Sequence, residues 1–254
     1  MASPTERFSS RVDNYIKYRP GYPPEIVHML STECGLTPNS VIADMGSGTG
    51  KLAELFLENG NRVFGVEPNE AMRHAGERLL KDYQHFVSIN GSAEDSTLPD
   101  SSIDFVTAGQ AFHWFDVPRA KAESKRILKP GGWAILVWND RKLESTPFLD
   151  DYEQMMLEFG TDYREVRHDR AVPAIEEFFG PQRAMLRIFP NQQIFDLDGL
   201  KGRVFSSSYT PEPNHPSFAP MVDRLEEIFT RNQSQGQVTF AYDTKVYFSK
   251  LNDG

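Results

Sequence analysis

Short apolar runs alternate with amphipathic stretches along the first half of the chain. Five runs have the length of buried strands, at 41–44, 61–67, 85–89, 102–109 and 133–138. The first amphipathic stretch, 51–59, places Leu52, Leu55 and Phe56 on one helical face, and Gly60 is its expected end. Strands that alternate with helices in this way predict βαβ units in a parallel, doubly wound sheet.

Two further helices are predicted between these strands. Asn69 and Asp116 are their expected N-caps, because short polar side chains accept hydrogen bonds from the first free N–H groups of a helix. The apolar face of the first of these helices holds Met72, Ala75, Leu79 and Leu80. The stretch "KPGG", residues 129–132, predicts a turn before the fifth strand.

The pattern changes after Trp138. Residues 145–182 are helical and irregular, 184–196 read as a strand or hairpin, 217–232 as a helix and 237–251 as a strand region. We therefore predict an α/β fold with a doubly wound, Rossmann-like sheet. This sheet is mostly parallel with an antiparallel C-terminal edge, and a helical cap is inserted after strand five. The expected single domain, 1–254, comprises an N-terminal helical lid (1–35), a cofactor-binding core (36–139), the cap (140–182) and elements that complete the sheet (183–254).

Composition and charge exclude several classes of partner. The net charge of −9 and the pI near 5.2 argue against a general nucleic-acid surface, although a local basic pocket for a small anion is compatible with them. The longest apolar run, 133–138, is too short to span a membrane, and the N-terminus lacks the apolar core of a secretory signal. Cys34 is the single cysteine, which excludes an intramolecular disulfide. We expect a cytoplasmic monomer or weak homodimer with a small-molecule substrate.

The stretch "VIADMGSGTG", residues 41–50, resembles a phosphate-binding turn but carries a negative charge at Asp44. A carboxylate there would repel a pyrophosphate and attract an ammonium or sulfonium group. Glu67 ends the second strand, where an acid can accept both hydroxyls of an adenosine ribose. A ligand with an adenosine, a positive charge and a carboxylate for the loop N–H groups satisfies both sites. S-adenosylmethionine is such a ligand.

Two other functions are less consistent with this loop. A nicotinamide-dependent oxidoreductase favours G-x-G-x-x-G, whereas Lys51 occupies the third-glycine position here and Asp44 opposes a phosphate. A non-catalytic interaction module has little reason to retain the charges of Asp44 and Glu67. Methyl transfer requires no metal, and the sequence shows no cluster with ligand spacing. The histidines other than His113 are scattered: His28, His74, His85, His168 and His215.

Four stretches resemble the successive motifs of class I S-adenosylmethionine-dependent methyltransferases. They are "ADMGSGTG" (43–50), "VEPNEAM" (66–72), "GSAEDSTLPDSSIDFVTAGQAFHWFD" (91–116) and "RILKPGGWAILVW" (126–138). More narrowly, they are similar to the small-molecule branch that includes trans-aconitate methyltransferases. The specific resemblance covers residues 8–139, including "YIKYRPGYPPEIV" (15–27).

The resemblance implies a role for each motif residue. Asp44 would face the amino group of the methionyl part, and Glu67 would bind the ribose. Other residues would surround the cofactor: Gly46, Ser47 and Gly48 at the methionyl part, Pro68 and Met72 near the adenine, Ala93 and Glu94 at the adenine edge, and Gln110 with a carbonyl near the sulfonium. One departure is Ser92, where many members carry an acid that accepts from the adenine amino group, so Glu94 takes part of that role.

The residues around the expected substrate leave several roles open. His113 is a candidate general base, substrate hydrogen-bond partner or packing residue. Phe112 and Trp114 form either an aromatic wall or part of the core. Tyr15, Tyr18 and Arg19 belong either to a lid over the cofactor or to a packed surface helix.

The segment 202–209, which ends at Tyr209, carries small hydroxyl residues that suit a pocket. The acceptor atom stays open among oxygen, nitrogen and carbon, and the resemblance favours a carboxylic acid.

Overall fold

A single seven-stranded sheet organises the chain. The computed structural model describes residues 12–143, 145–163, 172–180 and 184–251. The strand order is β3-β2-β1-β4-β5-β7-β6; strands β1 to β5 pair in parallel, and β7 pairs antiparallel with both β5 and β6. The predicted fold class is confirmed. The strands are β1 (Val41–Met45), β2 (Arg62–Val66), β3 (Phe86–Ile89), β4 (Ile103–Gly109), β5 (Leu128–Arg141), β6 (Met185–Phe195) and β7 (Val238–Lys250).

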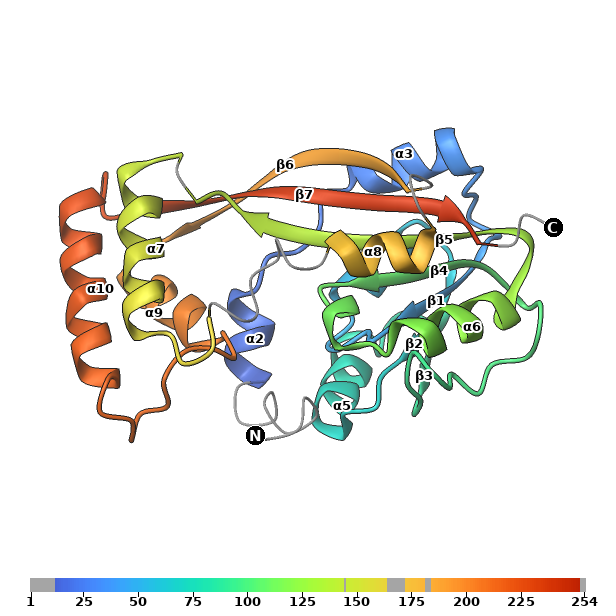
Figure 1. Ribbon diagram of the computed structural model, residues 1–254, viewed down its shortest axis with the longest axis horizontal. Helices are drawn as coiled ribbons and strands as arrows, with labels where there is room; N and C mark the ends of the chain where they lie inside the picture. The colour runs from blue at the N-terminus through green and yellow to red at the C-terminus, as the bar shows by residue number, and fades with distance from the viewer. Residues whose placement is uncertain (1–11, 144, 164–171, 181–183, 252–254) are drawn as a thin grey trace.

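Helices cover both faces of the parallel half, and others lie beyond it (Figure 1). The described helices are α2 (Val12–Tyr18), α3 (Glu25–Cys34), α4 (Lys51–Glu58), α5 (Glu70–Leu79), α6 (Val117–Ile127), α7 (Pro147–Phe159), α8 (Val172–Phe179), α9 (Leu197–Phe205) and α10 (Phe218–Asn232), with a 3₁₀ turn at Phe112–Trp114. The two predicted N-caps are confirmed: the Asn69 side chain accepts from the Met72 N–H, and Asp116 accepts from that of Arg119. Gly60, with φ of 91°, follows the end of α4 as expected.

The three longest strands carry the chain beyond the parallel half. Strands β5, β7 and β6 run along the long axis, and α7, α9 and α10 gather at one end of it, away from α5, α6 and α8 (Figure 1). This distal group has its own apolar core, in which Tyr152, Leu225 and Phe240 are buried. The interval 140–182, expected as one cap, is therefore divided, because α7 packs on α10 whereas α8 packs on α6.

Two local expectations were wrong. Leu79 is 47% exposed although Met72, Ala75 and Leu80 are buried. Leu79 is the last residue of α5, and it is the Leu80 side chain, beyond the end of the helix, that packs into the core. Residues 129–132 are no separate turn: they bulge within β5, whose pairing with β4 shifts between Ile103 and Phe105.

No helix among the described residues is long and apolar enough to cross a membrane.

Candidate active site

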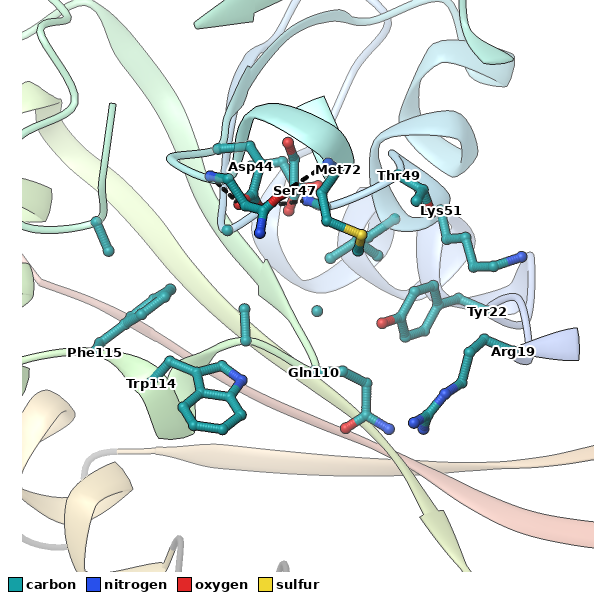
Figure 2. A pocket seen from close by; sticks show the side chains of 18 of the residues that line it. Arg19, Tyr22, Asp44, Ser47, Thr49, Lys51, Met72, Gln110, Trp114 and Phe115 are labelled. Carbon is teal, nitrogen blue, oxygen red and sulfur yellow. Dashed lines mark hydrogen bonds between the residues drawn. The ribbon is translucent and has the colours of Figure 1, made fainter. Parts of the chain in front are cut away.

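A pocket of about 200 Å³ opens at the carboxyl ends of the parallel strands, where open α/β sheets bind ligands. Asp44 and Ser47 lie on one side of it, Trp114 and Phe115 on another, and Arg19 and Tyr22 close it opposite the two aromatic rings (Figure 2). Most residues predicted at the cofactor line this pocket: Arg19, Asp44, Gly46, Ser47, Gly48, Glu67, Pro68, Met72, Ala93, Glu94 and Gln110.

The glycine loop is a tight turn that packs against the segment after β4. Gly46 has φ of 65°, and a Cβ at this position would lie 2.7 Å from the Ala111 Cβ, so the loop requires glycine there. The N–H groups of Gly46 and Ser47 donate to the Val66 carbonyl, at 2.8 and 3.1 Å. These two donors therefore fasten the loop to β2, whereas the sequence suggested that they would face a ligand carboxylate.

Glu67 fixes the loop from the other side. Its Oε2 accepts from the Gly48 N–H at 2.9 Å, and its Oε1 accepts from the Asn69 N–H at 2.8 Å. Burial raises the pKa of Glu67, and these two N–H groups act in the opposite direction. A carboxylate has about four acceptor positions, so each oxygen can still receive a ribose hydroxyl.

Asp44 is a buried acid with an incomplete set of partners. It is 1% exposed, and its Oδ1 accepts from the Thr107 hydroxyl at 2.8 Å. Burial raises its pKa to about 7; the Thr107 hydrogen bond lowers it, and the charge of Glu67 raises it further. Within the described residues its Oδ2 has no hydrogen-bond partner. A ligand ammonium beside Asp44 would supply both the missing donor and the compensating charge.

The side of the pocket expected to hold the adenine combines apolar and polar groups. Met72 contacts the glycine loop, since a Cβ on Gly48 would lie 3.3 Å from its Cε. Ser92 lines the pocket, and its Oγ accepts from the Glu94 N–H at 3.3 Å. The Glu94 Oε1 accepts from the Asp116 N–H at 2.9 Å, which leaves the other oxygen for a ligand amino group.

The 3₁₀ turn after β4 separates three residues that were expected at the substrate. Successive side chains of such a turn point about 120° apart. Trp114 lines the pocket, whereas Phe112 is 1% exposed and packs edge-on against Trp138 and Phe178. His113 is exposed, lies against the Trp114 ring and is not among the lining residues. Phe112 is thus a core residue, and His113 lies outside the pocket wall.

The segment from α2 to Tyr22, called the strap (residues 12–22), borders the pocket: Arg19, Pro20 and Tyr22 line it, and α2 contacts both α9 and α5. At its end Tyr22 approaches β4 closely: a Cβ on Gly109 would lie 2.5 Å from the Tyr22 hydroxyl. Arg19 donates to the Ser206 carbonyl at 3.1 Å. The backbone of Tyr15 lies in α2, and its side chain falls outside the described part of the structure.

Three lining residues from the C-terminal half were missed in the sequence. They are Asn139 at the end of β5, Arg203 on α9 and Tyr242 on β7. Arg203 had one signal, because it stands beside the buried Leu200 and Val204 on the apolar face of α9. Tyr209, expected in the pocket, instead packs on Tyr163 with ring centroids 5.0 Å apart and is not among the lining residues.

Comparison with known proteins shows the family. A family model described as a methyltransferase domain matches residues 43–136. An uncharacterised methyltransferase of Schizosaccharomyces pombe is 33% identical over 249 residues, which cover 96% of each chain. An uncharacterised methyltransferase of Mycobacterium tuberculosis is 39% identical over 134 residues, 53% of this chain and 52% of that protein, so the match spans about half of its length.

Solved structures agree on the fold. A protein of Anaeromyxobacter dehalogenans described as a type II methyltransferase superposes with a TM-score of 0.70 at 20% identity, over 92% of this chain and 98% of that one. The chain belongs to the methyltransferase family, and its cofactor is S-adenosylmethionine. The pocket fits this cofactor, because Asp44 lacks a donor at Oδ2 and Glu67 retains acceptor positions.

Proposed function

We propose that this chain transfers the methyl group of S-adenosylmethionine to an oxygen of a small carboxylic acid. The observation that carries the acceptor class is the make-up of the pocket wall, which contains no histidine among the described residues. Two of its acids, Asp44 and Glu67, face the cofactor in this proposal. An acceptor that needs no base is therefore favoured, and a carboxylate is already ionised at neutral pH.

The cofactor, when bound, supplies a methyl group on a positively charged sulfur. A carboxylate oxygen of the substrate forms the new carbon–oxygen bond as the carbon–sulfur bond breaks, and the electron pair of that bond stays on the sulfur. The products are a methyl ester and S-adenosylhomocysteine, and no proton is transferred. The chain has to hold the two reactants in line and exclude water, which can supply about 7–11 kcal/mol of the barrier.

The strap and the aromatic side of the pocket suit this task. Tyr22 closes one side and Trp114 another, so a small acid enclosed between them loses contact with bulk water (Figure 2). The resemblance to trans-aconitate methyltransferases in residues 8–139 supports the same acceptor class.

The test is a methylation assay with a panel of small carboxylic acids, phenols, alcohols and amines. We expect ester formation from at least one acid and no product from the other classes. Methylation of a phenol, an amine or a carbon acid in preference to every carboxylic acid would contradict the proposal.

The pH profile of His113→Ala provides a second test. Because His113 lies outside the wall, we expect its rate to stay within about threefold of the wild type, with the same pH dependence between about pH 6 and 8. A wild-type limb near pH 6.5 that vanishes in the variant, with a rate loss of about 10²–10⁴, would identify a general base and a different acceptor.

A further inference from the structure

The end of the strap is held at a carbonyl by two side-chain amides. The Gly21 oxygen accepts from the Nδ2 of Asn139 and from the Nδ2 of Asn191, each at 3.0 Å. A carbonyl oxygen has two lone pairs, so these two donors fill its capacity. Asn139 lies near the end of β5 and Asn191 lies on β6, so side chains of two sheet strands fasten the strap. These two amides on Gly21 form a latch.

The amide of Asn139 can take only one orientation. Its Oδ1 accepts from the Asn191 Nδ2 at 3.0 Å and from the Thr244 hydroxyl, and its Nδ2 faces the Gly21 carbonyl. Reversing the amide would set its oxygen against the Gly21 oxygen and its nitrogen against the Nδ2 of Asn191. Asn139 is 7% exposed, so water does not readily replace these partners. The latch therefore has a single hydrogen-bonded arrangement.

The main chain of Asn139 holds a second part of the pocket wall. Gln110, the residue after β4, has φ of 55°, in the left-handed region that a residue with a side chain rarely adopts. Its Nε2 donates to the Asn139 carbonyl and its N–H to the Val137 carbonyl, each at 3.0 Å. Two carbonyls of β5 thus hold a strained residue that lines the pocket between Trp114 and Arg19 (Figure 2). Strain of this kind persists where the surroundings fix it, often at a functional site.

We propose that Asn139 is a positioning residue that couples the strap to the loop of Gln110. Its side chain sets Gly21, and thereby the wall residues Arg19 and Tyr22, while its carbonyl sets Gln110. The latch has to release Gly21 before the strap can move away and the cofactor can leave. Asn139 thus governs how long the cofactor stays bound, and it acts through its neighbours rather than by contact with the reacting atoms. This role does not depend on the class of methyl acceptor.

Asn191 allows the latch to be tested apart from the pocket wall. It is not among the described residues that line the pocket, so Asn191→Ala removes one latch donor and leaves the wall unchanged. This variant should release S-adenosylhomocysteine about two- to tenfold faster, the range for one hydrogen bond. Stopped-flow tryptophan fluorescence measures the rate, because Trp114 lines the pocket. The backbone amides of Gly21 and Tyr22 should also exchange hydrogen faster. A release rate less than about twofold above that of the wild type would overturn the proposal.

Two control variants separate the latch from a general loss of stability. Thr244→Val removes a hydrogen bond to the same Asn139 amide but leaves both donors to Gly21. Gln192→Ala changes an exposed neighbour of Asn191 on β6. Both controls should release S-adenosylhomocysteine within about twofold of the wild type, even where Thr244→Val lowers the unfolding temperature. Equal release rates in Thr244→Val and Asn191→Ala would assign the effect to lost stability and contradict the latch.

A double-mutant cycle tests the coupling to Gln110. Gln110→Met keeps the length of the side chain and removes the donor to the Asn139 carbonyl. If both contacts act through Asn139, the variant that combines Gln110→Met with Asn191→Ala should release S-adenosylhomocysteine at least about threefold more slowly than the product of the two single effects predicts. Multiplicative effects, or a still faster release, would contradict the coupling. If Gln110→Met does not fold, Gln110→Glu, which also lacks the donor, takes its place in the cycle.

Discussion

The pocket has an acidic wall and a basic wall that come from different parts of the chain, and Lys51 of α4 adds a cation from the parallel half. The acidic wall, Asp44 and Glu67, follows β1 and β2 of the parallel half. The basic wall, Arg19 and Arg203, comes from the strap and from α9 of the distal group. Asp44 and Arg203 each lack a buried counter-charge among the described residues. Each wall therefore suits a ligand of the opposite charge.

The two walls also differ in how their charges are held. Glu67 is fixed by two backbone N–H groups of its own wall, which couples ligand binding there to the shape of the glycine loop. Arg203 is held by side-chain hydroxyls of Tyr242 and Ser207, which belong to the distal group. We infer that the acidic wall recognises a cofactor of fixed shape, and that the basic wall can change with the substrate while the cofactor site stays intact.

The largest expected effect comes from the acidic wall. Asp44→Asn should weaken S-adenosylhomocysteine binding by about 3–5 kcal/mol, because it removes one partner of a buried charge pair. The same substitution should weaken the binding of a desamino analogue, which lacks the ammonium, by less than about threefold. Calorimetry with both ligands measures the difference, and equal losses would assign Asp44 a structural role.

Glu67→Ala should weaken S-adenosylhomocysteine binding by about 1.5–3 kcal/mol, the range for hydrogen bonds to a charged group. Glu67→Gln is the matched control, since its amide oxygen can still accept from the loop or from a ribose hydroxyl. Calorimetry should give an affinity for S-adenosylhomocysteine that decreases from the wild type to Glu67→Gln and further to Glu67→Ala. A change below about threefold for Glu67→Ala would remove Glu67 from the ribose site.

Cofactor affinity should fall by about tenfold from pH 8 to pH 6. The pKa of Asp44 is raised to about 7, and only the ionised carboxylate pairs with an ammonium. Stability should change in the opposite direction. The folded pKa lies above the ordinary value of 3.8, so the folded chain holds the proton more tightly. This contribution to the free energy of unfolding is complete below about pH 4 and is lost as the pH rises through 7.

Asp44→Asn serves as the control for both pH effects. It should flatten the affinity profile measured by calorimetry and the stability profile measured by urea unfolding. Profiles that keep their slopes in this variant would assign the titration to another group.

A smaller effect is expected at the strap. A Cβ on Gly202 of α9 would lie 2.0 Å from the Tyr18 ring, so Gly202→Ala should displace α2 and raise the dissociation constant of S-adenosylhomocysteine by about three- to tenfold. Gly21→Ala is the control, because its Cβ would meet nothing within 4 Å. Backbone amides of residues 12–18 should also exchange hydrogen faster in Gly202→Ala. Equal dissociation constants and exchange rates in Gly202→Ala and Gly21→Ala would exclude a covering role for the strap.

The contrast between the walls explains what the sequence could predict. The acidic wall is encoded locally: Asp44 stands two residues before the first glycine of its loop, and Glu67 directly follows the next strand. Strand ends of a parallel sheet meet at one edge, so these positions follow from topology. In the basic wall Arg19 was predicted, but Arg203 is non-local: α9 and the long strand β7 bring it and its partner Tyr242 to a pocket formed more than 100 residues earlier in the chain.

Two further misses have local geometric causes. The identity of Phe112 and His113 could not show which of them faces the pocket, because that depends on the rotation of a single 3₁₀ turn. The sequence predicts a turn at residues 129–132 where β5 in fact continues, because the proline and glycines that mark a turn also occur in a bulge.

The separation of the two walls is tested most directly by titrating S-adenosylhomocysteine into three proteins: the wild type, Asp44→Asn and Arg203→Gln. We expect Asp44→Asn to lose more than about 100-fold in affinity, and Arg203→Gln to stay within about twofold of the wild type. Equal losses in the two variants, or a larger loss in Arg203→Gln, would show that one cofactor spans both walls and would contradict the assignment of the cofactor to the acidic wall alone.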